Sequence, residues 1–186
     1  MIAKTNTPFA LLAALALALA CSGCGTVYSA ARDQRSVGTI ADDKGIESAI
    51  KYELLRDEIV KGLDIAVYAF RGNVFLVGVI ERQIQQSRAV AIAKAQQGVR
   101  EVQTYLLEKQ KASLGRFFDD TAITAGVKAK LIKDTRIKST QIEVKTILGH
   151  VVLLGLTASR QMADLAVAHA RSVENVQAVK SFMIVE

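Results

Sequence analysis

The chain has 186 residues and a mass of 20.1 kDa, and 51% of its residues are hydrophobic while 23% are charged. This composition excludes a wholly disordered protein and fits one ordinary domain or two small ones. The formal net charge is +6. Both cysteines, Cys21 and Cys24, lie in an apolar N-terminal segment. The rest of the sequence therefore holds neither a disulfide framework nor a cysteine-based metal site.

The first 23 residues have the features of a bacterial export signal. Lys4 supplies a positive charge, and residues 9–20 form an uncharged apolar run that is too short for a permanent membrane span. Small residues surround the two cysteines that follow, which resembles the lipobox of a lipoprotein, whose cysteine carries diacylglycerol through a thioether. We predict lipidation at Cys24, with Cys21 as the alternative residue and a plain secreted protein as the alternative class. Gly25, in place of the aspartate that retains lipoproteins in the inner membrane, favours the outer membrane of a Gram-negative cell.

An internal repeat divides the remaining sequence. Residues 46–108 align without a gap on residues 123–185, at a constant offset of 77 positions, and many matched residues are identical. We therefore predict two copies of one small domain. The predicted segments are a signal peptide over 1–23, a lipidated tether over 24–43, a first domain over 44–109, a linker over 110–118 and a second domain over 119–186.

Hydrophobic periodicity predicts the elements of each copy in the order α-β-β-α-β. The first copy has a helix over 44–56, strands over 65–70 and 74–79 around a tight turn, a helix over 83–97 and a strand over 101–107. The second has a helix capped by Asp119 or Asp120, strands over 142–147 and 151–156, a helix over 159–172 and a strand over 177–185. The fold class is α+β, with two helices on a three-stranded mixed sheet. The first helix of each copy is expected to bury one stripe: Ile46, Ile50, Leu54 and Leu55, and Ile123, Val127, Leu131 and Ile132.

Several single residues are assigned to the fold rather than to chemistry. Asp57 and Asp134 recur just after the first helix of each copy, where aspartate caps helices or holds turns. His150 is expected at a hairpin turn, and His169 on the surface or partly buried side of a helix. We expect the repeated glycines to supply positive φ angles or close backbone packing; they are Gly72, Gly149, Gly78 and Gly155.

The repeat resembles a known domain. The phrases Val-Phe-Leu-Val-Gly at 74–78 and Val-Val-Leu-Leu-Gly at 151–155, with the closing segments 98–102 and 175–179, resemble the BON domain. Two copies behind a lipobox resemble the dual-BON lipoproteins of the DolP type. The resemblance implies a non-enzymatic, periplasm-facing protein, without cofactor or metal, that binds phospholipid and supports outer-membrane integrity. In that subgroup the first helix of the second domain contacts anionic lipid and carries a tryptophan where this chain has Ala122.

The charge distribution favours the same surface independently. Residues 46–108 hold eight basic and eight acidic residues, whereas residues 109–186 hold twelve basic and seven acidic ones. Each Lys or Arg near an anionic leaflet contributes about 1 kcal/mol to binding. We therefore predict a phospholipid-binding site on the first helix of the second domain, formed by Lys128, Lys130, Lys133, Arg136 and Lys138 together with Ala122 and Ile123.

Three other interpretations of the basic cluster remain. The first is an ordinary solvated helix face, and the second is a lipid-anchored adaptor that docks an envelope protein partner. Nucleic acid is the third, and export together with the lack of aromatic residues among the basic ones argues against it.

Overall fold

The computed structural model describes residues 37–109 and 119–186. The predicted signal peptide, both cysteines, most of the predicted tether and the predicted linker lie outside these ranges. The first domain contains α3 (Val37–Arg56), β1 (Ile65–Phe70), β2 (Asn73–Ile80), α4 (Gln83–Lys94) and β3 (Glu101–Glu108). The second contains α6 (Asp120–Lys133), a short 3-10 helix η1 (Ser139–Gln141), β4 (Ile142–Ile147), β5 (His150–Thr157), α7 (Arg160–Arg171) and β6 (Ala178–Val185).

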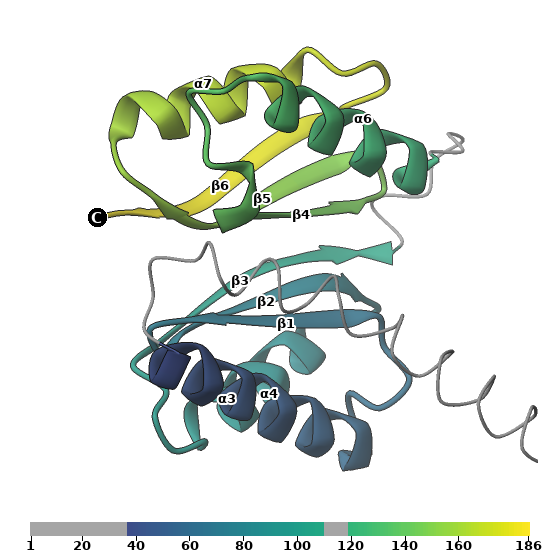
Figure 1. Ribbon diagram of the computed structural model, residues 1–186. Coiled ribbons are helices and arrows are strands. Elements are labelled where there is room, and N and C mark those ends of the chain that lie inside the picture. Colours follow the sequence, from purple (N-terminus) through teal and green to yellow (C-terminus); the bar gives the residue numbers. More distant parts are fainter. Residues whose placement is uncertain (1–36, 110–118) are drawn as a thin grey trace, which may run out of the picture. The chain divides into compact units, whose positions relative to one another are not determined.

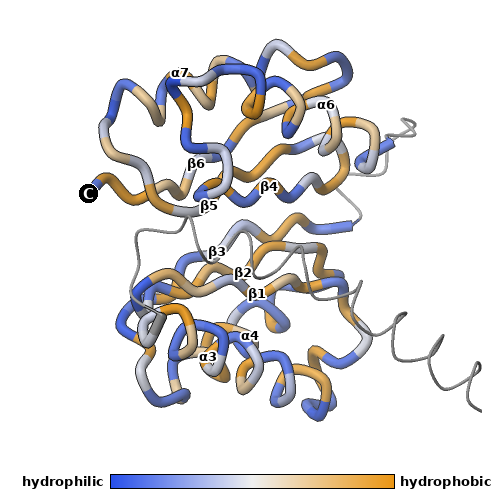
Figure 2. The backbone as a smooth tube through the Cα atoms, viewed as in Figure 1, coloured by the Kyte–Doolittle hydropathy of each residue, from blue (hydrophilic) through white to orange (hydrophobic). Residues whose placement is uncertain are grey.

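Each domain is a three-stranded mixed sheet with two helices on one face (Figure 1). In the first sheet β2 is central, antiparallel to β1 and parallel to β3, and in the second sheet β5 takes the same place between β4 and β6. The helices alternate between hydrophilic and hydrophobic residues along the chain (Figure 2). The predicted α+β fold and its α-β-β-α-β order are confirmed.

The two hairpins use the same two-residue turn. Arg71 and Gly72 have φ angles of 53° and 78°, and Leu148 and Gly149 have angles of 51° and 77°. Two consecutive positive φ angles fit the right-handed twist of antiparallel strands, and glycine adopts the second one without strain. The predicted role of these two glycines is confirmed.

The other repeated glycine pair marks a close approach between backbones. A Cβ atom on Gly78 would lie 2.0 Å from the carbonyl oxygen of Asp64, and one on Gly155 would lie 2.0 Å from that of Gln141. No side chain fits at such a distance, which confirms the predicted packing role.

The core of each domain lies between its helices and its sheet. In the first domain Ile46, Ile50 and Leu54 of α3 pack with residues of β1, β2 and α4. The second core repeats this arrangement with Ile123, Val127 and Leu131 of α6. These side chains are at most 8% exposed.

Two residues assigned to the buried stripes lie outside them. Leu55 is 71% exposed and Ile132 is 69% exposed. Each directly follows a buried leucine, and adjacent helical residues are about 100° apart around the axis, so only one of them can face the core. The expectation that Leu55 and Ile132 are buried was wrong.

Helix α3 begins at Val37, seven residues before the predicted start. The apolar stripe on which the prediction rested begins at Ile46, which left residues 37–43 outside the predicted helix. Asp43 is nevertheless buried, at 2% exposure, because its carboxylate accepts hydrogen bonds from the β1–β2 turn. Residues 37–43, which the sequence assigned to the tether, therefore belong to the folded domain.

A third buried cluster uses the sheet faces that the helices leave uncovered. Phe75 of β2 and Val152 and Leu154 of β5 belong to it, and none of them is more than 2% exposed. The rings of Phe75 and Phe182 have centroids 5.2 Å apart. The described residues all belong to one compact unit.

Candidate functional site

The outer face of α6 carries three of the seven predicted binding residues, Ala122, Lys128 and Lys133. The helix begins at a cap in which the Asp119 carboxylate accepts a hydrogen bond from the Ala122 amide, 2.9 Å away. Its buried stripe faces the second core, so the opposite side of the helix faces solvent. At about 100° per residue, the line farthest from the core consists of Ala122, Ala125, Ala129 and Ile132. All four of these residues are exposed.

Two lysines flank this line, one on each side. Lys128 lies on one side and is 3.3 Å from Glu143, and both side chains of this pair are more than 40% exposed. Lys133 lies on the other side and is exposed. The outer face is therefore a narrow line of three alanines and one isoleucine between two lysines.

The other predicted cations point elsewhere or are engaged. The Lys130 ammonium donates to the Ser172 carbonyl oxygen and hydroxyl, at 3.2 and 2.8 Å, at the end of α7. Arg136 donates twice to Asp134 through its guanidinium. Lys138 is exposed and lies just before η1. The five predicted cations thus do not form one cluster.

One predicted contact residue is unavailable to a ligand. Ile123 is 4% exposed and belongs to the second core. Its assignment to the lipid-binding set was wrong, because the helix turns it toward the sheet. Sequence reasoning missed Ala125, Ala129 and Ile132, although a helical projection of residues 120–133 already places them in line with Ala122.

The repeated aspartates hold the segment after the first helix of each domain. Asp57 accepts hydrogen bonds from the amides of Ile59 and Val60 and from the Arg88 guanidinium, 2.6 Å away. The Arg88 hydrogen bond lowers the pKa of Asp57 below its ordinary value. The expected structural role of this residue is confirmed.

In the second domain a histidine joins the corresponding aspartate. Asp134 accepts from Arg136 and lies 2.7 Å from Nε2 of His169 on α7. The hydrogen bonds from Arg136 and His169 lower the pKa of the Asp134 carboxyl. His169 is partly buried, as expected, and the cluster links the end of α6 to α7. His150 begins β5, directly after the turn, and its Nδ1 is 2.7 Å from the Tyr105 hydroxyl.

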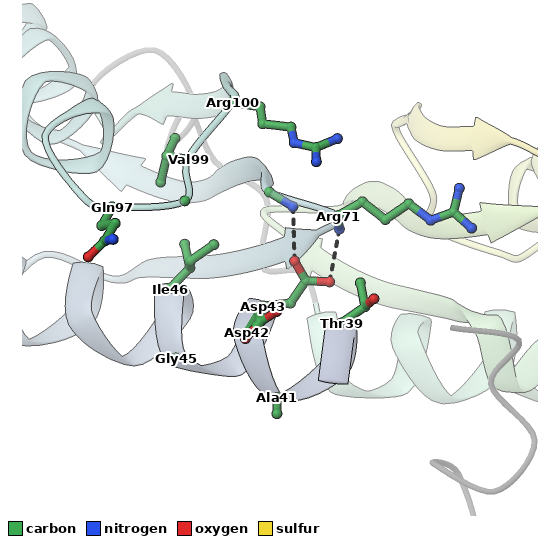
Figure 3. A pocket seen from close by; sticks show the side chains of 12 residues that line it. Thr39, Ala41, Asp42, Asp43, Gly45, Ile46, Arg71, Gln97, Val99 and Arg100 are labelled. Carbon is green, nitrogen blue, oxygen red and sulfur yellow. Dashed lines mark hydrogen bonds between the residues drawn. The ribbon is translucent and has the colours of Figure 1, made fainter. Parts of the chain in front are cut away.

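A cavity of about 960 Å³ lies in the first domain beside the β1–β2 turn. Figure 3 shows the Asp43 carboxylate bound to the amides of Arg71 and Gly72 at its wall, at 2.8 and 2.9 Å. Asp120 binds the amides of Leu148 and Gly149 in the same way. This clamp between helix and turn is a repeated structural device that sequence reasoning missed, although the 77-residue offset relates Asp43 to Asp120.

Two residues at the rim of this cavity differ from their counterparts in the second domain. Arg71 and Arg100 extend from the rim (Figure 3), and the positions 77 residues later hold Leu148 and Gln177. Arg71 forms an ion pair with Glu186.

Within residues 37–109 and 119–186, no group of three or more His, Cys, Asp or Glu residues is placed to hold a metal ion. None of the helices in those ranges is long and apolar enough to cross a bilayer.

Comparison with known proteins identifies the domain. Residues 42–108 and 119–186 each match the BON domain. The chain is 33% identical over 147 residues to osmotically-inducible protein Y of Escherichia coli K12, covering 78% of this chain and 73% of the relative. It is 32% identical to the 21 kDa hemolysin of Actinobacillus pleuropneumoniae, covering 79% and 76%. It is 29% identical to the outer membrane lipoprotein DolP of Haemophilus influenzae, covering 84% and 81%. The chain belongs to the BON domain family and contains two copies of the domain.

Proposed function

We propose that this chain is a non-enzymatic lipoprotein of the bacterial envelope, anchored in the outer membrane through Cys24 and facing the periplasm. Its second BON domain binds anionic phospholipid through the outer face of α6, and this binding supports envelope integrity. The lipobox-like segment and the similarity to an outer membrane lipoprotein support the location.

The outer face of α6 is the observation that carries the proposal. Lys128 and Lys133 would each contribute about 1 kcal/mol near an anionic leaflet. Ile132, 69% exposed between them, gains about 1.5–3 kcal/mol when its side chain is fully buried in an apolar medium. The alanines beside it let the helix approach the headgroups closely. Such modest contributions to the binding free energy suffice for membrane contact when a lipid anchor already holds the domain at the membrane.

The charge balance supports the choice of lipid and of domain. The surplus of five basic residues lies in 109–186, while 46–108 is balanced. Binding that depends on this surplus is selective for anionic headgroups and weakens with salt, because exposed charges are screened over about 10 Å at 0.1 M ionic strength.

The test is flotation of residues 25–186, without acyl chains, on vesicles of phosphatidylcholine with or without phosphatidylglycerol, at low and moderate salt. Changing both Lys128 and Lys133 to Gln is expected to weaken binding to the anionic vesicles by about 2 kcal/mol, roughly thirtyfold in affinity. The matched control changes Arg160 and Arg171 of α7 to Gln, which removes the same charge from the same domain.

The control separates a site from a general charge effect. Equal losses in the two double variants would mean that binding follows overall charge, which contradicts the assignment to α6. Absence of binding by the parent chain to anionic vesicles would leave the acyl chains as the membrane contact. That result would favour the alternative function of a lipid-anchored adaptor for an envelope protein.

A further inference from the structure

The first domain carries a larger exposed apolar line than the second, on its corresponding helix. Tyr52 and Leu55 lie on the outer side of α3 and Ile59 in the turn after it, and they are 57%, 71% and 40% exposed. A spacing of three residues places Tyr52 and Leu55 on the same side of α3, and Ile59 follows in the turn after the helix. They are three of the six large hydrophobic residues that are exposed within the described ranges.

A groove lies beside this line. It has a volume of about 240 Å³ and runs next to Leu55, with a mostly apolar lining. An exposed ridge beside an apolar groove can bury methylene groups from a partner on both of its sides, which a flat helix face cannot do. The groove lining comprises Lys51, Leu54, Leu55, Val60, Gly62, Leu63 and Ile65.

The rim of the line carries charges of both signs in balance. Residues 51–61 hold three basic and three acidic residues. Lys61 pairs with Glu58, and the Arg56 guanidinium lies over the Tyr52 ring, 5.1 Å from its centroid. A balanced rim does not select an anionic surface. It does match headgroups that carry one positive and one negative charge each, and tyrosine with flanking Lys or Arg is the usual composition of a membrane-interface contact.

The position of α3 in the chain favours a bilayer over other occupants. Val37 is thirteen positions after Cys24, so a tether from the predicted lipid anchor spans at most about 45 Å. A connection this short holds the domain at an effective concentration of about millimolar relative to the membrane. A patch of three side chains, too small to bind a free partner, is sufficient under that condition.

We propose that Tyr52, Leu55 and Ile59 form a second membrane contact, which inserts into the zwitterionic lipid of the bilayer that holds the anchor. This inference rests on the proposed lipid anchoring, but not on anionic lipid binding by α6. The two proposed contacts lie on helices of different chemistry. The α3 contact is apolar and insensitive to salt, whereas the α6 contact is electrostatic.

The experiment uses the absence of tryptophan from the sequence. Residues 24–186 retain Cys24 as their sole cysteine, which can be coupled to a maleimide lipid in vesicles to reproduce the anchor. Tyr52→Trp places a single fluorescent reporter on α3. Ala129→Trp, at the position 77 residues later, places the matched reporter on α6. Vesicles of brominated phosphatidylcholine then report insertion through quenching and a blue shift of the emission.

We expect the Tyr52→Trp variant to be quenched and blue-shifted in phosphatidylcholine at both low and moderate salt. Adding Leu55→Asp to it should abolish both changes, and adding Ile84→Asp, on the exposed side of α4, should preserve them. An unquenched Tyr52→Trp variant in phosphatidylcholine would overturn the proposal. A concentration-dependent blue shift of the uncoupled protein would overturn it in favour of a second copy as the occupant.

The other reporter keeps the two proposals separate. The Ala129→Trp variant is expected to be quenched only when brominated phosphatidylglycerol is included. Failure of that response together with quenching of the Tyr52→Trp variant would contradict the function proposed for α6 and support the α3 contact. The reverse result would leave α6 supported and the α3 contact overturned.

Discussion

The two BON domains share a backbone plan but differ on the outer side of their first helix. The line on α3 and the turn after it is Tyr52, Leu55 and Ile59, and the positions 77 residues later hold Ala129, Ile132 and Arg136. One surface is large and apolar, and the other is small, less apolar and flanked by cations. The comparison shows that the repeat preserved what forms the domain and changed what the domain presents to its surroundings.

The preserved residues are those that the backbone requires. The glycine of each turn, the glycine of each close approach, and the aspartates that bind the turn and the segment after the first helix all recur at the offset of 77. None of these residues lies on the outer helix faces. Stability should therefore respond alike to corresponding changes in the two domains, while membrane binding should respond differently.

The largest effect on stability is expected from the glycines of the close approach. Gly78→Ala forces the β1 side of the first sheet away from β2, because the new Cβ would meet a carbonyl oxygen at 2.0 Å. The expected loss is about 3 kcal/mol. Gly155→Ala should lose about 1 kcal/mol more, because Gly155 also has a φ angle of 127°. Urea unfolding followed by circular dichroism measures both losses.

Gly45→Ala provides the control for these variants. Apart from its chain neighbours and the nearby backbone of the helix, no atom lies within 4 Å of its added Cβ, and the residue lies inside α3. Alanine is favoured over glycine in a helix by about 1 kcal/mol, so this variant should be more stable than the parent. If Gly78→Ala were tolerated equally well, the two backbones would not approach as closely as described.

The clamp between helix and turn should give the next largest effect. Asp43→Ala leaves the amides of Arg71 and Gly72 without their acceptor, which should cost about 1–3 kcal/mol. Asp120→Ala should cost less, because Asp120 is only partly buried. Asp42→Ala, at the exposed neighbouring position, is the control in the same unfolding measurement. A larger loss for Asp120→Ala than for Asp43→Ala would contradict the assigned difference in burial.

A smaller effect, which depends on pH, is expected at the aspartates after the first helices. The pKa values of Asp57 and Asp134 are lowered in the folded protein from an ordinary value of 3.8, so ionisation of these carboxyls stabilises the fold. That stability is fully present above pH 3.8 and is lost as the pH falls below it toward the lowered values. Asp57→Asn and Asp134→Asn should therefore destabilise the protein at pH 7, and the difference from the parent should shrink at pH 3. Unfolding midpoints in urea at the two pH values provide the measurement. An unchanged difference would mean that the carboxylate charge contributes nothing.

The helices and strands could be predicted from the sequence because the residue patterns that indicate them are local. Alternating apolar runs define the strands, and each lies within two residues of its predicted bounds. The helix faces were predicted less well. Leu55 and Ile132 were placed in the core because a pair of adjacent apolar residues does not indicate which one faces inward. Asp43 was left out of the first helix because the apolar stripe used for the prediction starts at Ile46.

The arrangement of the candidate site depends on contacts between residues that are far apart in the sequence. Lys130 donates to Ser172, which is 42 residues away, and His169 meets Asp134 across 35 residues. Both contacts depend on how α6 packs against α7. The predicted cations are close together in the sequence, but the helix places them on different sides. The outer line of α6 can be identified only once its buried residues are known.

The smallest effect on stability is expected where the two domains differ most. Tyr52→Ala gives α3 an alanine at the position that corresponds to Ala129 of α6. It also removes the aromatic ring over which the Arg56 guanidinium lies. An exposed cation–π pair contributes about 0.5–1 kcal/mol, and the higher helix propensity of alanine offsets part of that loss, so the unfolding midpoint in urea should barely change. A loss comparable with that of Asp43→Ala would mean that Tyr52 supports the fold. Its exposure would then have a structural cause, and the contrast between the outer faces would lose its functional meaning.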